Sequence, residues 1–237
     1  MTIGYFEFLG KKSTDFGLLI DAEISFSSPQ VKGEYVEIPG ADGELFLGDG
    51  KLSNVSKSFP VFLENSNTQI VSTQISNWLK SVSEWSELMF SGDPEYVYTA
   101  LYTDEYEVSA NLESYGKSIL TFTLKPYKFL KSGLAPLTSP TALNNPTTRD
   151  ARPLITIKGT GNITLKIGAE TLTLKSVDGG VVIDCLKQTV TNLAGTAPAW
   201  DKVTSYPLPV IKPGNQVVLT TGTVTSLTIV PRYEVIV

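Results

Sequence analysis

The chain has 237 residues, with 24 acidic and 19 basic side chains, a formal net charge of −5 at pH 7, one cysteine and no histidine. This mildly acidic balance, without a basic run, argues against nucleic-acid binding as the main activity, because phosphate contacts need clustered Lys and Arg. The absence of histidine removes Ser-His-Asp and Cys-His activation and the commonest zinc ligand. We therefore expect no enzyme activity, no cofactor and no metal.

Targeting signals are not evident at the N-terminus. Its charges stand in the wrong places for a signal peptide, and no apolar run reaches membrane-spanning length. The single cysteine, Cys185, cannot form an intrachain disulfide and lies in an apolar alternating run, which predicts a buried small hydrophobe. We expect a protein made in a cytoplasm, without membrane insertion.

The first part of the chain reads as short strands separated by turns. Two turn signals, Pro39-Gly40 and Asp42-Gly43, follow the apolar residues around Val36. Strands are predicted at residues 5–9, 16–20, 55–63, 87–90, 96–102, 105–112 and 117–126.

One amphipathic helix is predicted over residues 66–85. Ser66 followed by Gln69 is a capping box. The apolar positions recur at alternating steps of four and three, which is the spacing of one buried helical face. They are Val71, Ile75, Trp78, Val82 and Trp85, widened by Ile70 and Leu79. Two interpretations remain open: both tryptophans are core residues, or the helix fixes a sheet edge or face against a neighbouring subunit.

The glycine, lysine and serine at residues 116–118 have two readings. A phosphate-binding loop would need a glycine at position 111, which is Asn111, and a helix after the motif. Both flanks read as strands, so a hairpin turn is the favoured prediction.

A change in composition predicts two domains. Residues 1–131 form a β domain with the helix, residues 132–152 form a Pro-rich extended linker, and residues 153–237 form a second β domain. This last region has alternating strands with turn signals every eight to twelve residues, which is typical of a β-sandwich. The predicted fold class is therefore mainly β, with two β domains.

Two aromatic residues, Trp200 and Tyr206, lie in a predicted loop of the second domain. Exposed aromatic rings on such a loop can stack on the apolar face of a sugar. Alternatively, they plug one end of the sandwich. The first interpretation gives the alternative function, a carbohydrate-binding module that contacts host cell-wall glycans.

An ordered set of segments resembles the distal tail protein (Dit) family of long-tailed phages, or prophages, of Gram-positive bacteria. In the first domain they are residues 15–18 (DFGL), 36–45 (VEIPGADGEL), 93–100 (DPEYVYTA) and 124–127 (LKPY). In the second they are residues 145–147 (NPT), 151–155 (ARPLI), 159–165 (GTGNITL), 177–180 (VDGG), 183–185 (IDC), 213–215 (PGN) and 230–232 (VPR). Ala41 stands where the family usually has Arg or a similar residue.

The resemblance implies a structural hub at the distal end of a virion tail. It implies a ring-forming N-terminal domain, a homo-hexamer, and a C-terminal galectin-like or carbohydrate-module-like sandwich outside the ring. The implied partners are the tail tube protein, the tape measure protein, the tail-tip or tail-associated lysin hub protein and the receptor-binding apparatus. DNA would pass through the channel without being bound.

An acidic, glycine-rich stretch at residues 39–50 is a candidate lining for that channel. It carries Asp42, Glu44 and Asp49, with no basic residue before Lys51. Repeated around a ring, these carboxylates would make a negative collar that repels DNA. The alternative interpretation is a solvated surface turn.

Overall fold

The computed structural model describes residues 4–20, 24–64, 68–107, 109–111 and 115–237. The chain divides into two compact units, Met1–Lys128 with Ile236–Val237, and Phe129–Val235. Both units are built mainly of β-strands that pair in antiparallel fashion. The predicted mainly β fold is thus confirmed.

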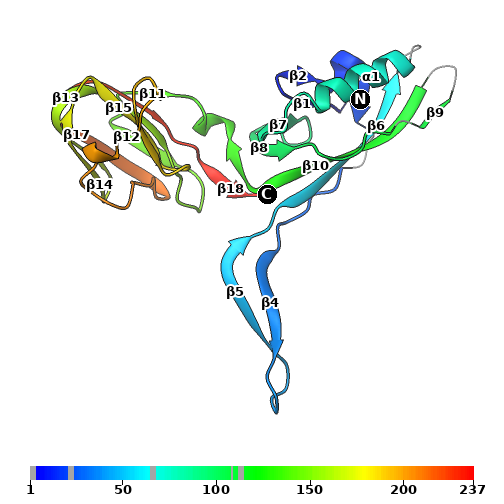
Figure 1. Ribbon diagram of the computed structural model, residues 1–237, viewed down its shortest axis with the longest axis horizontal. Helices are drawn as coiled ribbons and strands as arrows, with labels where there is room; N and C mark the ends of the chain where they lie inside the picture. Colours follow the sequence, from blue (N-terminus) through cyan, green and yellow to red (C-terminus); the bar gives the residue numbers. More distant parts are fainter. Residues whose placement is uncertain (1–3, 21–23, 65–67, 108, 112–114) are drawn as a thin grey trace. The chain divides into compact units, whose positions relative to one another are not determined.

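A nine-stranded sheet forms most of the first unit (Figure 1). Its strand order is β2-β1-β7-β8-β10-β6-β3, with β9 and β18 also paired to β10. The strands are β1 (Phe6–Phe8), β2 (Lys11–Lys12), β3 (Leu18–Ile20), β6 (Val55–Glu64), β7 (Ser86–Phe90), β8 (Tyr96–Leu101), β9 (Ser109–Asn111), β10 (Tyr115–Leu130) and β18 (Glu234–Ile236). A short 3-10 helix, η1 (Ser13–Phe16), connects β2 and β3.

The helix α1 (Thr68–Leu79) covers one face of this sheet. Trp78, in the last turn of the helix, is buried, stacks on Phe16 with ring centroids 4.6 Å apart, and donates its indole N–H to the carbonyl of Phe8 at 3.0 Å. The hydrogen bond satisfies the one polar atom of the indole inside an apolar core. The prediction that Trp78 is a core residue is confirmed.

The helix is shorter than the predicted 66–85. Ser81 ends it, because its hydroxyl and its backbone N–H both donate to the carbonyl of Trp78, which competes with continued helical bonding. Val82 and Trp85 therefore lie beyond the helix and are exposed, and Ile70 is 55% exposed rather than part of the apolar stripe. The predicted capping serine at position 66 lies outside the described residues.

The second unit contains seven paired strands. Their order is β11-β17-β13-β15-β16, with β12 also paired to β17 and β14 to β13. They are β11 (Leu137–Thr138), β12 (Ala142–Asn145), β13 (Leu154–Ile167), β14 (Glu170–Val177), β15 (Gly180–Asp184), β16 (Thr189–Asn192) and β17 (Gly214–Val230). Two 3-10 helices, η2 (Lys131–Gly133) and η3 (Trp200–Lys202), complete the unit.

Long strands bend to make the second unit sandwich-like. β13 pairs with β15 through its first half and with β14 through its second half, while β17 follows both halves across register shifts. At the bend, a Cβ on Gly159 would approach the carbonyl oxygen of Thr223 to 2.3 Å, so only glycine fits there. Bulges of this kind let one strand pass from one layer to the other.

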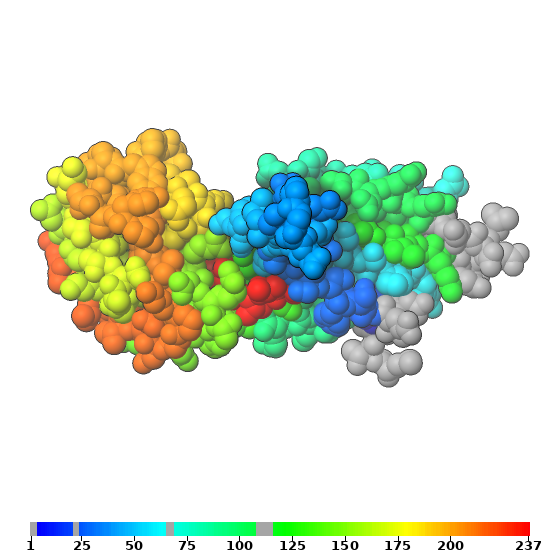
Figure 2. All heavy atoms as spheres, turned by 90° about the horizontal axis from the view of Figure 1, so that it is seen from below, coloured from blue at the N-terminus to red at the C-terminus, as the bar shows by residue number. Residues whose placement is uncertain are grey.

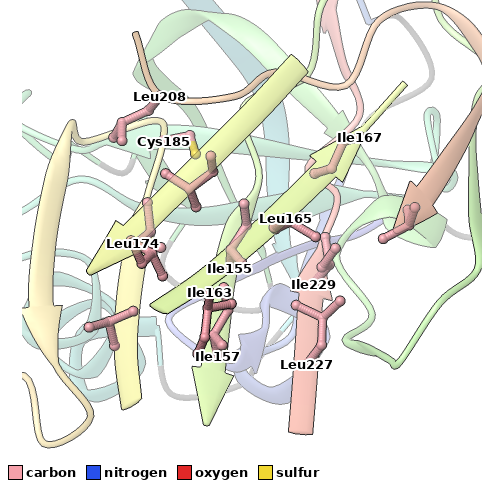
Figure 3. Packing of buried hydrophobic residues seen from close by; sticks show 14 of the residues in the cluster. Ile155, Ile157, Ile163, Leu165, Ile167, Leu174, Cys185, Leu208, Leu227 and Ile229 are labelled. Carbon is pink, nitrogen blue, oxygen red and sulfur yellow. The ribbon is translucent and has the colours of Figure 1, made fainter. Parts of the chain in front are cut away.

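Alternating side chains of these strands form the core shown in Figure 3. Ile155 and Ile157 from β13 and Ile229 from β17 are fully buried within it. Cys185 lies in the same core, and burial raises the pKa of its thiol to about 12. The predicted role of Cys185 as a buried hydrophobe is confirmed.

Two predictions about connections are wrong. Residues 132–152 are not an extended linker, because β11 and β12 pair with β17 and so belong to the second unit. Gly116, Lys117 and Ser118 are not a turn, because they lie inside β10 opposite β6, and they form no phosphate loop. Residues 112–114, between β9 and β10, lie outside the described residues.

Candidate functional site

The candidate site is a hairpin, here called the arm, made of β4 (Val31–Glu37), β5 (Glu44–Leu52) and the turn between them. Its two strands form a separate two-stranded sheet, and each residue from position 31 to position 51 is exposed. The arm extends away from the strands that precede and follow it in Figure 1, and its atoms lie uncovered in Figure 2 (blue). An isolated two-stranded hairpin is only marginally stable in water, so contacts with another surface would stabilise the arm.

One face of the arm is aromatic. Tyr35 and Phe46 are directly opposite across the strands, with ring centroids 5.1 Å apart, and Tyr35 is 68% exposed. Gly33 and Gly48 form the neighbouring pair, and a Cβ on either would come within 2.7 Å of the Phe46 ring. The two glycines therefore let the ring of Phe46 lie flat across the arm.

The other face of the arm is aliphatic. Val36 is opposite Leu45, and Leu47 stands two residues further along β5 on the same face, because side chains alternate along a strand. These three residues and Ile38, next to the turn, are all exposed. A hairpin with apolar side chains on both faces is typical of a segment that is buried in an assembly.

The end of the arm is acidic. Glu37 and Glu44 are directly opposite each other, and Asp42 lies in the turn beside them. Asp49 lies further back on β5, where its carboxylate accepts a hydrogen bond from the backbone N–H of Lys51 at 2.8 Å. The predicted acidic loop at residues 39–50 is thus wrong as a single loop, since Glu44 and Asp49 belong to a strand. Like charges directly across a sheet repel, so a cationic partner would stabilise this end.

The base of the arm is fastened to the core of the first unit. Ser53 donates its N–H and its hydroxyl to the carbonyl of Gln30, at 2.9 and 3.1 Å. Buried Lys57 donates to the carbonyl of Ser25, and its Nζ lies 4.3 Å from the centroid of the Phe26 ring. Burial lowers the pKa of the Lys57 ammonium from 10.5 to about 8. These contacts hold the segment that leads into the arm.

The two loop aromatics of the second unit differ in how far they are exposed. Trp200 begins η3, Tyr206 follows it in the same loop, and their ring centroids are 6.2 Å apart. Trp200 is 39% exposed and Tyr206 is 72% exposed. Tyr206 therefore lies at the surface of the loop, whereas Trp200 is more than half covered.

Within the described ranges, no group of three or more Cys, Asp or Glu side chains is arranged to hold a metal ion. No described helix is long and apolar enough to cross a membrane.

Sequence reasoning missed the apolar residues of the arm. The signal was present, because apolar runs at residues 35–38 and 45–47 flank the turn at residues 39–43, which is a hairpin pattern. What the pattern does not reveal is that this hairpin stands apart from the nine-stranded sheet.

A helix-backed sheet, a sandwich-like unit and an exposed hairpin arm together define a two-unit, mainly β protein. The same fold occurs in the crystal structure of the SPP1 Dit (gp 19.1) protein, described as a paradigm of the hub adsorption apparatus in phages that infect Gram-positive bacteria. The likeness has a TM-score of 0.69 and 15% sequence identity, and it covers 99% of this chain and 100% of the other. No family model and no curated protein matches the sequence.

Proposed function

We propose that this chain is a structural hub protein of a phage tail tip. Six copies form a ring that joins the tail tube to the host-adsorption apparatus and leaves a channel for DNA. The observation that carries the proposal is the likeness to the SPP1 Dit protein over essentially the whole of both chains. The likeness includes both units, and so it supports a shared architecture. A match to the sandwich alone would be weaker support, because that fold is common and hosts many functions.

The arm supports assembly as the function of the first unit. Its two apolar faces can be buried only by other surfaces, and within the described residues its strands pair with nothing else. In a closed ring each copy can offer its arm to the next copy, so every arm is covered and no edge remains open. We infer that residues 1–131 carry oligomerisation.

The remaining assignments follow from the hub role. The partners are the tail tube protein, the tape measure protein, the tail-tip or tail-associated lysin hub protein and the receptor-binding apparatus. The protein is made in the host cytoplasm and acts at the distal end of the virion tail. Its role is structural and non-catalytic, and DNA passes through without being bound.

The test is the particle that the full-length chain forms in solution. Native mass spectrometry should give six times the chain mass of 25.7 kDa, and electron microscopy should show a ring with a central channel. Because tail hubs can need neighbours to assemble, the measurement is repeated with the tail tube protein present. A chain that stays monomeric under both conditions at tens of micromolar contradicts the proposal.

A further inference from the structure

Lys57, on β6 of the first unit, is a buried cation without an anionic partner. It is 4% exposed and belongs to none of the ion pairs among the described residues. Its ammonium donates a hydrogen bond to the carbonyl of Ser25, which is a neutral acceptor. A buried lysine is ordinarily paired with an acid, because removing its charge from water is costly. An anion brought to this ammonium would therefore be stabilised.

The nearby acid is already engaged by other groups. The carboxylate of Asp93 pairs with Lys128 at 2.5 Å and accepts a hydrogen bond from the hydroxyl of Tyr98. Burial lowers the pKa of Lys57 to about 8, although the charge of Asp93 opposes this shift. Asp93 therefore does not neutralise Lys57, and the surroundings of the ammonium remain short of negative charge.

A pocket of about 180 Å³ adjoins this lysine. Its wall is mainly apolar and belongs entirely to the first unit; the lining residues are Phe26, Ser27, Ser28, Val55, Lys57, Tyr98, Leu124 and Val237. The Nζ atom of Lys57 lies 4.3 Å from the ring centroid of Phe26, which is part of the wall, and 4.7 Å from that of Phe90. An apolar cavity of about 150 Å³ holds a benzene molecule, so this pocket has room for a group of that size.

We propose that this pocket binds a small carboxylic acid whose apolar group is about the size of a benzene ring, with the carboxylate paired to the ammonium of Lys57. An apolar wall with few polar groups is typical of small-molecule sites, and a charge-assisted hydrogen bond to one cation fixes the orientation of the ligand. The proposal does not rest on the hub function.

The size of the pocket selects among the possible carboxylates. The side chain of a glutamate or aspartate has at most two methylene groups and would leave much of the volume empty. A free aromatic or branched acid fills it, and so does the C-terminal residue of a peptide that ends in phenylalanine. Because Phe26, Ser27 and Ser28 belong to the segment that leads into the arm, either occupant would also fasten the base of the arm.

The experiment is an NMR titration of the full-length chain with benzoate, with N-acetyl-phenylalanine and with benzamide, the neutral counterpart of benzoate. We expect a dissociation constant on the order of 1 mM for at least one of the two carboxylates. Benzamide should bind at least about tenfold more weakly than benzoate, because it carries no charge to pair with Lys57. Tighter binding of benzoate indicates a free acid as the ligand, and tighter binding of N-acetyl-phenylalanine indicates the end of a peptide.

The pH dependence of the affinity gives a second readout. Both carboxylates stay ionised above pH 7, whereas Lys57 loses its proton near pH 8, so the affinity should fall about tenfold between pH 7 and pH 9. The chain has no histidine, and burial raises the pKa of the Tyr98 hydroxyl, so that hydroxyl stays protonated. Asp93 and Lys128, the other charged groups nearby, remain paired with each other.

Two variants test the pocket itself. Lys57→Met keeps an apolar side chain and removes the charge, so it should weaken carboxylate binding at least about tenfold and abolish its pH dependence. Phe26→Ala removes part of the wall and should weaken binding severalfold; Phe26 is 67% exposed, so this variant should still fold. Lys125→Met is the matched control, because it removes an exposed lysine outside the pocket and should leave binding unchanged.

Melting curves establish that each variant is folded. The proposal is overturned if neither carboxylate binds, if benzamide binds as tightly as benzoate, or if the affinity is the same at pH 7 and pH 9. It is also overturned if Lys57→Met and Phe26→Ala both bind as the unsubstituted chain does.

Discussion

Trp78 shows how one side chain joins the helix to the sheet. It stacks on Phe6 and Phe16 and bonds to the backbone of Phe8, so it contacts β1, the following 3-10 helix and the core between them. We expect Trp78→Ala to lower the free energy of unfolding by about 3–5 kcal/mol, measured in denaturant melts.

Trp78→Phe separates packing from hydrogen bonding at the same position. The smaller ring keeps part of the stacking but leaves the Phe8 carbonyl without its indole donor, so the loss should be about 1–3 kcal/mol. A loss under about 1 kcal/mol for Trp78→Ala is incompatible with the buried position of this side chain.

Lys57 makes stability depend on pH in the alkaline range. Its pKa falls from 10.5 to about 8, chiefly through burial, with Asp93 opposing and Lys128 adding to the shift. Between these values the unfolded chain binds a proton that the folded chain has released. The unfolding free energy contributed by this group therefore rises from pH 8 to pH 10.5, and below pH 8 the full penalty of the buried charge is present.

The measurement compares the unsubstituted chain with Lys57→Met in denaturant melts from pH 7.5 to 9.5. The stability difference between the two should change across this range in favour of the unsubstituted chain as the pH rises. Lys125→Met is the control, because Lys125 is exposed. A pH-independent difference for Lys57→Met excludes the lowered pKa.

In the arm, the effect of a substitution on the stability of the single chain can be measured separately from its effect on assembly. We expect Leu45→Asp with Leu47→Asp to change the unfolding free energy by no more than about 0.5 kcal/mol, because both side chains are exposed in the single chain. The same double substitution should abolish the oligomer, since it places two charges on the aliphatic face. Sedimentation velocity measures the second effect.

Ile70→Asp is the control for the arm variant. Ile70 is also an exposed aliphatic side chain, but it lies on α1 and not on the arm. The oligomer should persist in this variant. If Ile70→Asp removes the oligomer and the arm variant does not, the interface lies on the helix.

The sequence patterns predicted those elements that bury one face, because one-sided burial leaves a regular spacing of apolar residues. The helix stripe at Val71, Ile75 and Trp78 and the alternation of Ile155 and Ile157 follow directly from one-sided burial, and these residues are buried. The end of the helix and the full lengths of β13 and β17 could not be predicted from the spacing of apolar residues. They depend on a serine hydrogen bond and on bulges, which leave no periodic signal.

The candidate site was less predictable than the core. Asp42, Glu44 and Asp49 were identified by charge, but only the strand register shows that Glu44 is opposite Glu37 and that apolar residues cover both faces beside them. Likewise, the exposure of Trp200 and Tyr206 depends on how their loop is fastened to β14, through side-chain bonds between residues about 30 positions apart.

For the whole molecule, the acidic end of the arm bears on how DNA passes a ring. In a hexamer the carboxylates of Asp42, Glu44 and Asp49 would recur six times, with no basic residue between positions 33 and 50 to offset them. We propose that they lie in or near the channel, where their repulsion keeps DNA from binding.

The lysine variant of all three acids tests this placement. All three are exposed in the chain, so the ring should still form. Each lysine pressed against phosphate releases counterions, so the assembled variant should retain double-stranded DNA at low salt and lose it steeply as salt rises. Filter binding of assembled rings across a salt series measures both effects. The unsubstituted ring should retain no DNA at any salt concentration. If the variant ring also retains no DNA, the acidic end of the arm lies away from the DNA path, and the proposed placement is wrong.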